Sequence, residues 1–318
     1  MQGDTRTAVS ISEELIFIPY WTLSKDSDTT SYDTLVYFGI AANENGIVSD
    51  AGSENVEKFN TKATNAQKKL LTLRMVDHDT NTKILDDKNV QKKIIQQTIS
   101  FAKENNFDGI VIDFESKSLG FEEVTDSTTD FITQSVEGIK KSGLEAHTLL
   151  FGDNYYRARA FDVERIAKVS DSIMIMSYDF HKSGGSPGPT FPTSGKEVYG
   201  YDFPTMLEDF ASDAQRDKTV VIIGMFGYDW KVDKDGNSIV PATPLTFGEA
   251  DLIFLNSCNK KNCKVEIDKN TYEAKITYTE DGNRREAWVE TRDSKDKKVK
   301  ILEKYGISKV GYWAYSFF

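Results

Sequence analysis

The sequence is poor in the residues that build metal and redox sites. It has 2 cysteines, Cys258 and Cys263, which lie close together with no second pair and no nearby histidine. A zinc site is therefore disfavoured, and either a local disulfide or two free thiols fits better. The 3 histidines, His78, His147 and His181, form no HExxH pattern, and no glycine-rich phosphate loop occurs. We expect neither a metal nor an organic cofactor.

Long apolar runs and a basic surface are also missing. No stretch approaches the ~18 apolar residues of a membrane span, and the opening MQGDTRTAVSIS lacks the basic and apolar regions of a secretory signal. The net charge of −11 would repel nucleic acid and anionic membrane surfaces, and no cluster of basic and aromatic residues offsets it. We therefore expect neither nucleic acid nor a membrane as a partner, and we expect a monomer.

What the sequence does contain is the pattern of an α/β barrel. With 39% hydrophobic and 28% charged residues, it has ample material for a packed core. Short apolar runs alternate with amphipathic stretches, which predicts a parallel sheet with crossover helices, and residues 1–318 as one (β/α)8 (TIM) barrel domain. The eight expected strands are Leu15–Pro19, Thr34–Gly39, Leu70–Val76, Gly109–Phe114, Ala146–Phe151, Ser172–Tyr178, Thr219–Phe226 and Lys309–Tyr315.

The gap between the seventh and eighth expected strands is unusually long. It contains the hairpin-like segment YEAKITYTEDGNRREAWVE, which turns at Asp281–Gly282, and then DSKDKKVKILEKYG, a helix pattern ending at Gly306. We predict a small α+β insertion at about residues 229–300. Since the sequence stops soon after the eighth strand, the barrel is expected to lack its last outer helix or to be truncated.

The fourth expected strand carries two carboxylates on one face. In DGIVIDFE, period-two alternation puts Ile110, Ile112 and Phe114 on one face and Val111, Asp113 and Glu115 on the other. Active sites of such barrels lie at the C-terminal strand ends. Two inward carboxylates at that end suggest an acid with a raised pKa beside an ionised partner. For an isolated pair, however, pairing with basic residues is the favoured interpretation.

DGIVIDFE resembles the DxxDxDxE motif of glycoside hydrolase family 18, with Asp108, Asp113 and Glu115 on its first, third and last acidic positions. Val111 stands where most chitinases have the middle Asp. Met176-Ser177-Tyr178-Asp179 is similar to the family's MxYD motif. The following FHKSGGSPGP, and the segment from the hairpin to the last strand, resemble the bacterial cell-wall and spore-cortex branch. The third and fifth strand ends, RMVDHD and FGDNYY, depart from common chitinase patterns.

The resemblance assigns further residues to substrate binding. Trp313 occupies the position of the strand-eight tryptophan that forms the floor under the sugar. Tyr20, Met176, Asp179, Tyr228 and Asp108 complete the predicted substrate-binding set. Other aromatic or apolar residues near strand ends are Trp21, Phe38, Met225 and Trp230. Core packing is the alternative interpretation for each of them and the favoured one for Phe38 and Met225.

The resemblance also implies a mechanism in which the substrate's own 2-acetamido oxygen is the nucleophile. Glu115 would protonate the leaving oxygen and later activate water, Asp113 would bind the acetamido N–H, and Tyr178 would donate to the acetamido carbonyl. The implied substrates are chitin oligomers or peptidoglycan strands containing N-acetylglucosamine, and the implied location is secreted or associated with the cell wall. A catalytically weak or inactive glycan-binding protein on the same barrel is the alternative.

Val111 adds one expectation about the site. Because the lower acidic partner is absent, we expect Asp113 to stay turned toward Glu115 without ligand. Apolar Val111 also adds desolvation that opposes the charge of Asp113, so hydrogen bonds from Tyr178 or backbone donors would have to keep Asp113 ionised.

Overall fold

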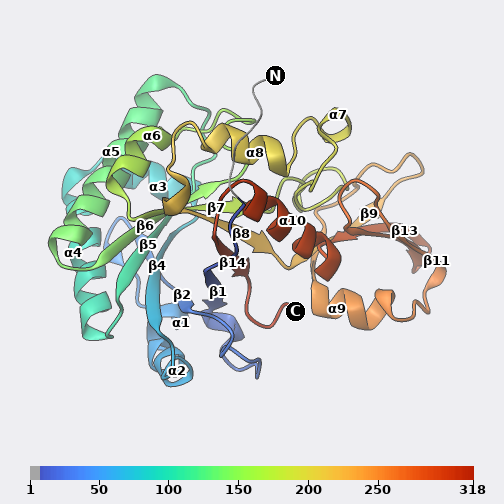
Figure 1. The fold of residues 1–318 in the computed structure, drawn as a ribbon, viewed down its shortest axis with the longest axis horizontal. Helices are drawn as coiled ribbons and strands as arrows, with labels where there is room; N and C mark the ends of the chain where they lie inside the picture. The colour runs from blue at the N-terminus through green and yellow to red at the C-terminus, as the bar shows by residue number, and fades with distance from the viewer. Residues whose placement is uncertain (1–7) are drawn as a thin grey trace.

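A computed structural model describes residues 8–318; the first seven residues, at the start of the segment examined for a signal, lie outside the described part. Eight parallel strands close into a barrel (Figure 1), because β1 pairs with both β2 and β14. All eight strands predicted from the sequence are confirmed, with ends shifted by a few residues. The barrel strands are β1 (Glu13–Pro19), β2 (Thr34–Asn43), β4 (Lys68–Met75), β5 (Gly109–Phe114), β6 (Glu145–Phe151), β7 (Ser172–Ser177), β8 (Thr219–Gly224) and β14 (Lys309–Trp313).

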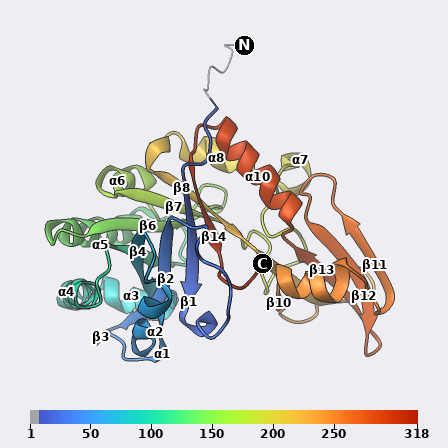
Figure 2. The same ribbon diagram turned by 60° about the horizontal axis from the view of Figure 1, so that its bottom comes forward.

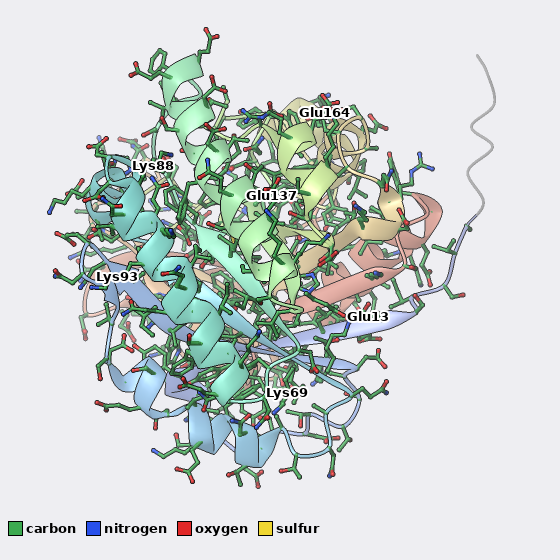
Figure 3. All side chains as sticks on the ribbon, turned by 90° about the vertical axis from the view of Figure 1, so that its left-hand side faces the viewer. Glu13, Lys69, Lys88, Lys93, Glu137 and Glu164 are labelled. Atoms are coloured by element: carbon green, nitrogen blue, oxygen red, sulfur yellow. A yellow bond between two sulfur atoms is a disulfide. The ribbon has the colours of Figure 1, made fainter. Side chains whose placement is uncertain are left out.

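Helices cover the outside of the barrel. On α4, the apolar positions Ile94, Ile95 and Ala102 are buried, whereas the lysines of the helix are exposed to solvent. Figure 3 shows the same division, with Lys88 and Lys93 of α4 and Glu137 of α5 pointing away from the strands. The helices are α1 (Ala51–Glu54), α2 (Val56–Lys62), α3 (His78–Leu85), α4 (Lys88–Glu104), α5 (Glu122–Lys141), α6 (Val163–Val169), α7 (Lys196–Tyr199), α8 (Phe203–Phe210) and α10 (Arg292–Lys304). The short helical turns Tyr20–Thr22 and Arg216–Lys218 and the small strand β3 (Gly46–Ile47) also belong to this part of the chain.

Alternation along each strand separates two cores. Ile110, Ile112 and Phe114 of β5 pack with the helices in the larger core, while Val111 packs inside the barrel with residues such as Leu15 and Met174. The predicted faces of β5 are therefore confirmed. The consequence for the site is that Asp113, two residues beyond Val111, also points into the barrel and is 2% exposed.

The long gap after β8 forms a second, antiparallel sheet that stands beside the barrel, with α10 between the two (Figure 2). Its strand order is β10-β9-β13-β12-β11, and it begins at Phe226, slightly before the predicted start of the insertion. A disulfide links Cys258 to Cys263, which lies on the edge strand β11. The elements are β9 (Phe226–Val232), β10 (Thr243–Thr246), α9 (Phe247–Ala250), the helical turn Asp251–Leu255, β11 (Lys261–Ile267), β12 (Ala274–Glu280) and β13 (Asn283–Val289).

The C-terminal end of the chain lies against the insertion. No helix follows β14 among residues 8–318, and Phe317 O accepts a hydrogen bond from Gly248 N at 2.9 Å. Over the same residues, every helix is too short or too polar to cross a membrane.

Candidate active site

The backbone of Glu115 is fixed immediately after β5. Glu115 N donates to Met75 O at 2.8 Å. The buried amide of Asn81, on α3, donates to Glu115 O at 2.7 Å and to Met75 O at 2.6 Å. These bonds satisfy backbone groups where the strand ladder stops. Glu115 is thereby held at the C-terminal end of the barrel, where the sequence predicted the site.

The surroundings of Glu115 raise its pKa from the ordinary value toward neutral pH. Burial, followed by the negative charge of Asp179, raises the pKa of Glu115 to about 7, while Arg159, Lys182 and Lys117 oppose that rise. A carboxylic acid with a pKa near the working pH can both donate and accept a proton, which general acid–base catalysis requires. The acid with a raised pKa that the sequence predicted at this strand end is therefore present.

Asp113 lies deeper than Glu115. Its Oδ1 is buried and has no hydrogen-bond partner, so no bond to that oxygen from Tyr178 or the backbone keeps Asp113 ionised, contrary to our expectation. Burial and the charge of Glu115 raise the pKa of Asp113 well above its ordinary value; Arg74 is the cation that counters them. Arg74 is the register neighbour of Asp113 on β4. A bound ligand with a hydrogen-bond donor would satisfy the unpaired oxygen.

Asp179 and Tyr178 follow β7. Asp179 has a φ of 59°, in the left-handed region, and its Oδ1 accepts a hydrogen bond from the Tyr228 hydroxyl at 2.7 Å. Burial raises the pKa of Asp179, and the Tyr228 hydrogen bond opposes that rise. The ring of Tyr178 stacks on Trp313 with their centroids 6.3 Å apart. Burial and the nearby charge of Asp113 raise the pKa of Tyr178 well above its ordinary value, so it remains a hydroxyl donor.

Trp313, at the end of β14, is the centre of an aromatic cluster. Phe38 meets it edge-on at 4.7 Å, Phe17 lies 5.9 Å away, and Trp21 lies 6.4 Å away. Trp313 itself is only partly buried, and Trp21 is 50% exposed. The packing holds these rings in place while leaving apolar surface available to a ligand.

The remaining predicted residues fall in different places. Tyr20 joins the aromatic cluster through Trp21, with centroids 5.0 Å apart. Met176 is buried within the barrel core. Asp108 precedes β5 and accepts a hydrogen bond from Lys69 N at 2.7 Å. Asp108 lies five positions before Asp113, roughly 17 Å away along the strand. The structure therefore brings all of the predicted site residues to one end of the barrel or its core except Asp108.

Several charged residues of the site were not predicted. Arg74 lies over the ring of Tyr20, 4.9 Å from its centroid, and donates to Gly39 O at 3.0 Å. Arg159 pairs with Asp153 on the loop after β6. Arg74 lies in RMVDHD and Asp153 in FGDNYY, the two strand ends that departed from the common pattern. The departure of these two strand ends from the common pattern was the sequence signal that could have identified these charged residues.

The arrangement combines a proton donor, a second buried carboxyl, a tyrosine hydroxyl and an exposed aromatic surface. Among residues 8–318, no group of three or more His, Cys, Asp or Glu side chains is placed to hold a metal ion. These groups suit a polar ligand with one apolar face, such as a sugar ring.

Comparison with known proteins gives a consistent picture. The family model described as glycosyl hydrolases family 18 matches residues 14–317. A cortical fragment-lytic enzyme of Bacillus subtilis is 21% identical over 238 residues, which are 72% of this chain and 51% of the relative. The spore cortex-lytic enzyme SleL of Bacillus cereus superposes with a TM-score of 0.74 at 20% identity, covering 98% of this chain and 72% of SleL.

A chitinase of Cycas revoluta, solved in complex with (GlcNAc)3, superposes with a TM-score of 0.77 at 17% identity, covering 95% of each chain. At such identities the structural likeness shows the fold alone. The chain spans about half to two thirds of the length of the first curated relatives it matches.

Proposed function

Because the chain belongs to family 18 of the glycosyl hydrolases, we propose that it hydrolyses β-linked glycans containing N-acetylglucosamine and retains the configuration at the anomeric carbon. The observation that carries the proposal is the carboxyl of Glu115, at the C-terminal end of β5, whose pKa is raised to about 7. Such a group is about half protonated at neutral pH and largely protonated below it, so it can protonate a leaving glycosidic oxygen.

The nucleophile in this proposal is the 2-acetamido oxygen of the bound sugar, as in the substrate-assisted glycosidases. Its attack on the anomeric carbon forms an oxazolinium ion as Glu115 gives its proton to the departing oxygen. Asp113 accepts a hydrogen bond from the acetamido N–H, and its unpaired Oδ1 supports this role. Tyr178 donates to the acetamido oxygen. The Glu115 carboxylate then takes a proton from the water that opens the oxazolinium.

Binding is assigned to the aromatic surface and the charged groups around it. Trp313 packs against the apolar face of the sugar over Asp113, with Tyr20 at one edge of the cluster. Asp179, oriented by Tyr228, contacts sugar hydroxyls or the leaving side. The names of the relatives in Bacillus, which act on the spore cortex, favour peptidoglycan, while the chitinase complex with (GlcNAc)3 supports chitin oligomers as a second substrate. We propose that the protein acts as a monomer, without a cofactor, outside the cell or at its wall.

Substituting Glu115 tests the proposal. In Glu115→Gln the turnover of chitin oligomers and peptidoglycan strands, followed by product mass, should fall by about 10²–10⁴-fold or more, because a general acid is lost. Binding should be largely retained. Glu122→Gln, at an exposed position on α5, is the matched control and should retain normal turnover. Turnover near the unsubstituted level in Glu115→Gln would refute the assignment, and binding without turnover in the unsubstituted protein would identify a glycan-binding protein instead.

A further inference from the structure

Three loops beside Glu115 carry four cations. Lys117 follows β5, Arg157 and Arg159 follow β6, and Lys182 follows β7. The net charge of the whole sequence is −11. Four cations therefore lie on loops that adjoin the proposed acid, although the chain as a whole is acidic.

Hydrogen bonds connect the three loops to one another. Gly120 N, in the loop after β5, donates to Ala158 O at 2.7 Å, and Leu119 bridges to Arg159. On the other side, the guanidinium of Arg157 donates to Phe180 O at 2.7 Å, in the loop after β7. The four cations thus belong to one continuous rim, which begins at Glu115 and ends beyond Asp179.

The two arginines have an acidic partner and the two lysines do not. Asp153 is 4% exposed and accepts from Arg157 and Arg159 together. Lys117 and Lys182 are exposed, and within residues 8–318 no carboxylate lies within 4.0 Å of either ammonium group. Lys117 interacts electrostatically with Asp77 and Glu115, and Lys182 interacts with Glu115 and Asp179.

These cations work against the proposed acid. Arg159, Lys182 and Lys117 each favour the ionised form of Glu115 and thus oppose the rise of its pKa. A site selected only to keep Glu115 protonated would not place unpaired ammonium groups there. Their placement makes physical sense if a negative charge on the substrate lies between them.

The position of Glu115 indicates which part of the substrate carries that charge. A general acid lies next to the oxygen that it protonates, so groups on the same rim face the leaving sugar. In a strand where N-acetylglucosamine is β-1,4-linked to muramic acid, this oxygen is on carbon 4 of muramic acid. The lactyl ether is on carbon 3, the adjacent carbon.

We propose that Lys117 and Lys182 bind the free lactyl carboxylate of a muramic acid residue in the leaving position. This inference rests on the proposed glycosidase function and narrows its substrate to an anionic glycan. The lactyl carboxyl is uncharged where it is amide-linked to a peptide. The preferred strands are therefore those from which an amide-hydrolysing reaction has already removed the peptides.

Binding to the Glu115→Gln protein tests the proposal without turnover. Three probes are compared by calorimetry: a tetrasaccharide of alternating N-acetylglucosamine and N-acetylmuramic acid with free lactyl carboxylates, the same tetrasaccharide with lactyl carboxamides, and the chitin tetrasaccharide. The free carboxylate should bind at least about tenfold more tightly than the carboxamide, the scale of one charge-assisted hydrogen bond. Added salt should reduce this preference, because exposed charges are screened.

Substitution then assigns the preference to residues. Lys117→Met and Lys182→Met together, in the Glu115→Gln background, should abolish the preference while changing carboxamide binding less than about twofold. Lys300→Met, exposed on α10, is the matched control and should leave the preference intact. Equal binding of the carboxylate and carboxamide probes, or a preference that survives the double substitution, would overturn the proposal.

The two proposals fail in different ways. Hydrolysis of chitin tetrasaccharide by the unsubstituted protein, with no carboxylate preference in binding, would overturn only the recognition of muramic acid. A lysine-dependent carboxylate preference with no hydrolysis of any probe would support the recognition and overturn the glycosidase function. Absence of binding to all three probes would overturn both.

Discussion

Replacing Lys298 by methionine should be among the most destabilising single changes in this protein. Lys298, on α10, is fully buried, and its Nζ lies 2.5 Å from Glu290 Oε2 and 3.8 Å from Glu273 Oε1. Both carboxyl groups are themselves 0% exposed. Glu273 also accepts hydrogen bonds from Thr190 N at 2.7 Å and from Phe191 N at 3.3 Å. This cluster joins the insertion and α10 to the loop that follows β7.

Removing the ammonium group leaves the buried carboxylate of Glu290 with no cation beside it. Breaking a buried pair by deleting one partner costs about 3–5 kcal/mol. For a domain of 318 residues, each kcal/mol lowers Tm by about 1.5 °C, so we expect a decrease of roughly 4–8 °C. The double variant Lys298→Met/Glu290→Gln should be more stable than the single variant, since it removes the unpaired charge.

The loss of stability in Lys298→Met should depend on pH. Burial, followed by the charge of Glu290, raises the pKa of Glu273 from its ordinary value of 4.5 to about 8. The folded state therefore holds a proton that the unfolded state releases above about pH 4.5. This contribution is fully present below that pH and is lost as the pH rises toward 8. Without Lys298 the pKa of Glu273 rises further, so the deficit of the variant should grow between pH 6 and pH 9.

Scanning calorimetry and urea unfolding across that pH range measure both effects. Lys300→Met, exposed on the same helix, is the control and should change stability by no more than about 0.5 kcal/mol. A loss below about 1 kcal/mol for Lys298→Met, or a deficit that shrinks as the pH rises, would refute this account of the cluster.

Three further outcomes are expected. The profile of kcat/KM against pH should fall above about pH 7, the pKa of Glu115. Asp179→Asn should shift this fall to lower pH, because it removes the largest charge that raises the pKa of Glu115. A fall at unchanged pH in Asp179→Asn would contradict the assignment of Glu115. A thiazoline mimic of the oxazolinium ion should inhibit competitively and bind more tightly than substrate, whereas full activity in its presence would point to a two-carboxylate mechanism. Gly227→Ala should lower the free energy of unfolding in urea by about 1–3 kcal/mol or more, because the added Cβ would lie 1.8 Å from Trp288 O. The control is Gly138→Ala on α5, whose Cβ would lie 3.5 Å from Ile95, an ordinary contact, and which should not lower stability.

The barrel could be predicted from the sequence because its causes are local. Apolar runs at the right spacing make strands, and in β5 the alternation alone separated Ile110 and Ile112 from Val111 and Asp113. The position of Glu115 followed, since parity and the end of a strand decide where its side chain is directed. The boundaries of the insertion were less certain, because β9 begins at Phe226, almost without a break after β8.

Asp108 illustrates the limit of motif reasoning. It belongs to the same sequence motif as Asp113 and Glu115, yet it lies at the opposite end of β5, since a strand separates residues by length even when a motif groups them. The sequence also left open whether Cys258 and Cys263 form a disulfide or are two free thiols, and the structure shows the disulfide.

The sequence by itself determined the order of the strands along the chain, the two faces of β5, and which acidic and aromatic residues lie at strand ends. All three follow from short-range periodicity. Only the tertiary structure decided which charges surround Glu115. Asp179, Arg159 and Lys182 come from loops after other strands, and the pKa of Glu115 depends on their distances and on burial, which no local pattern encodes. The buried contact of Lys298 with Glu273 and Glu290 was likewise decided in three dimensions, where α10 meets the insertion.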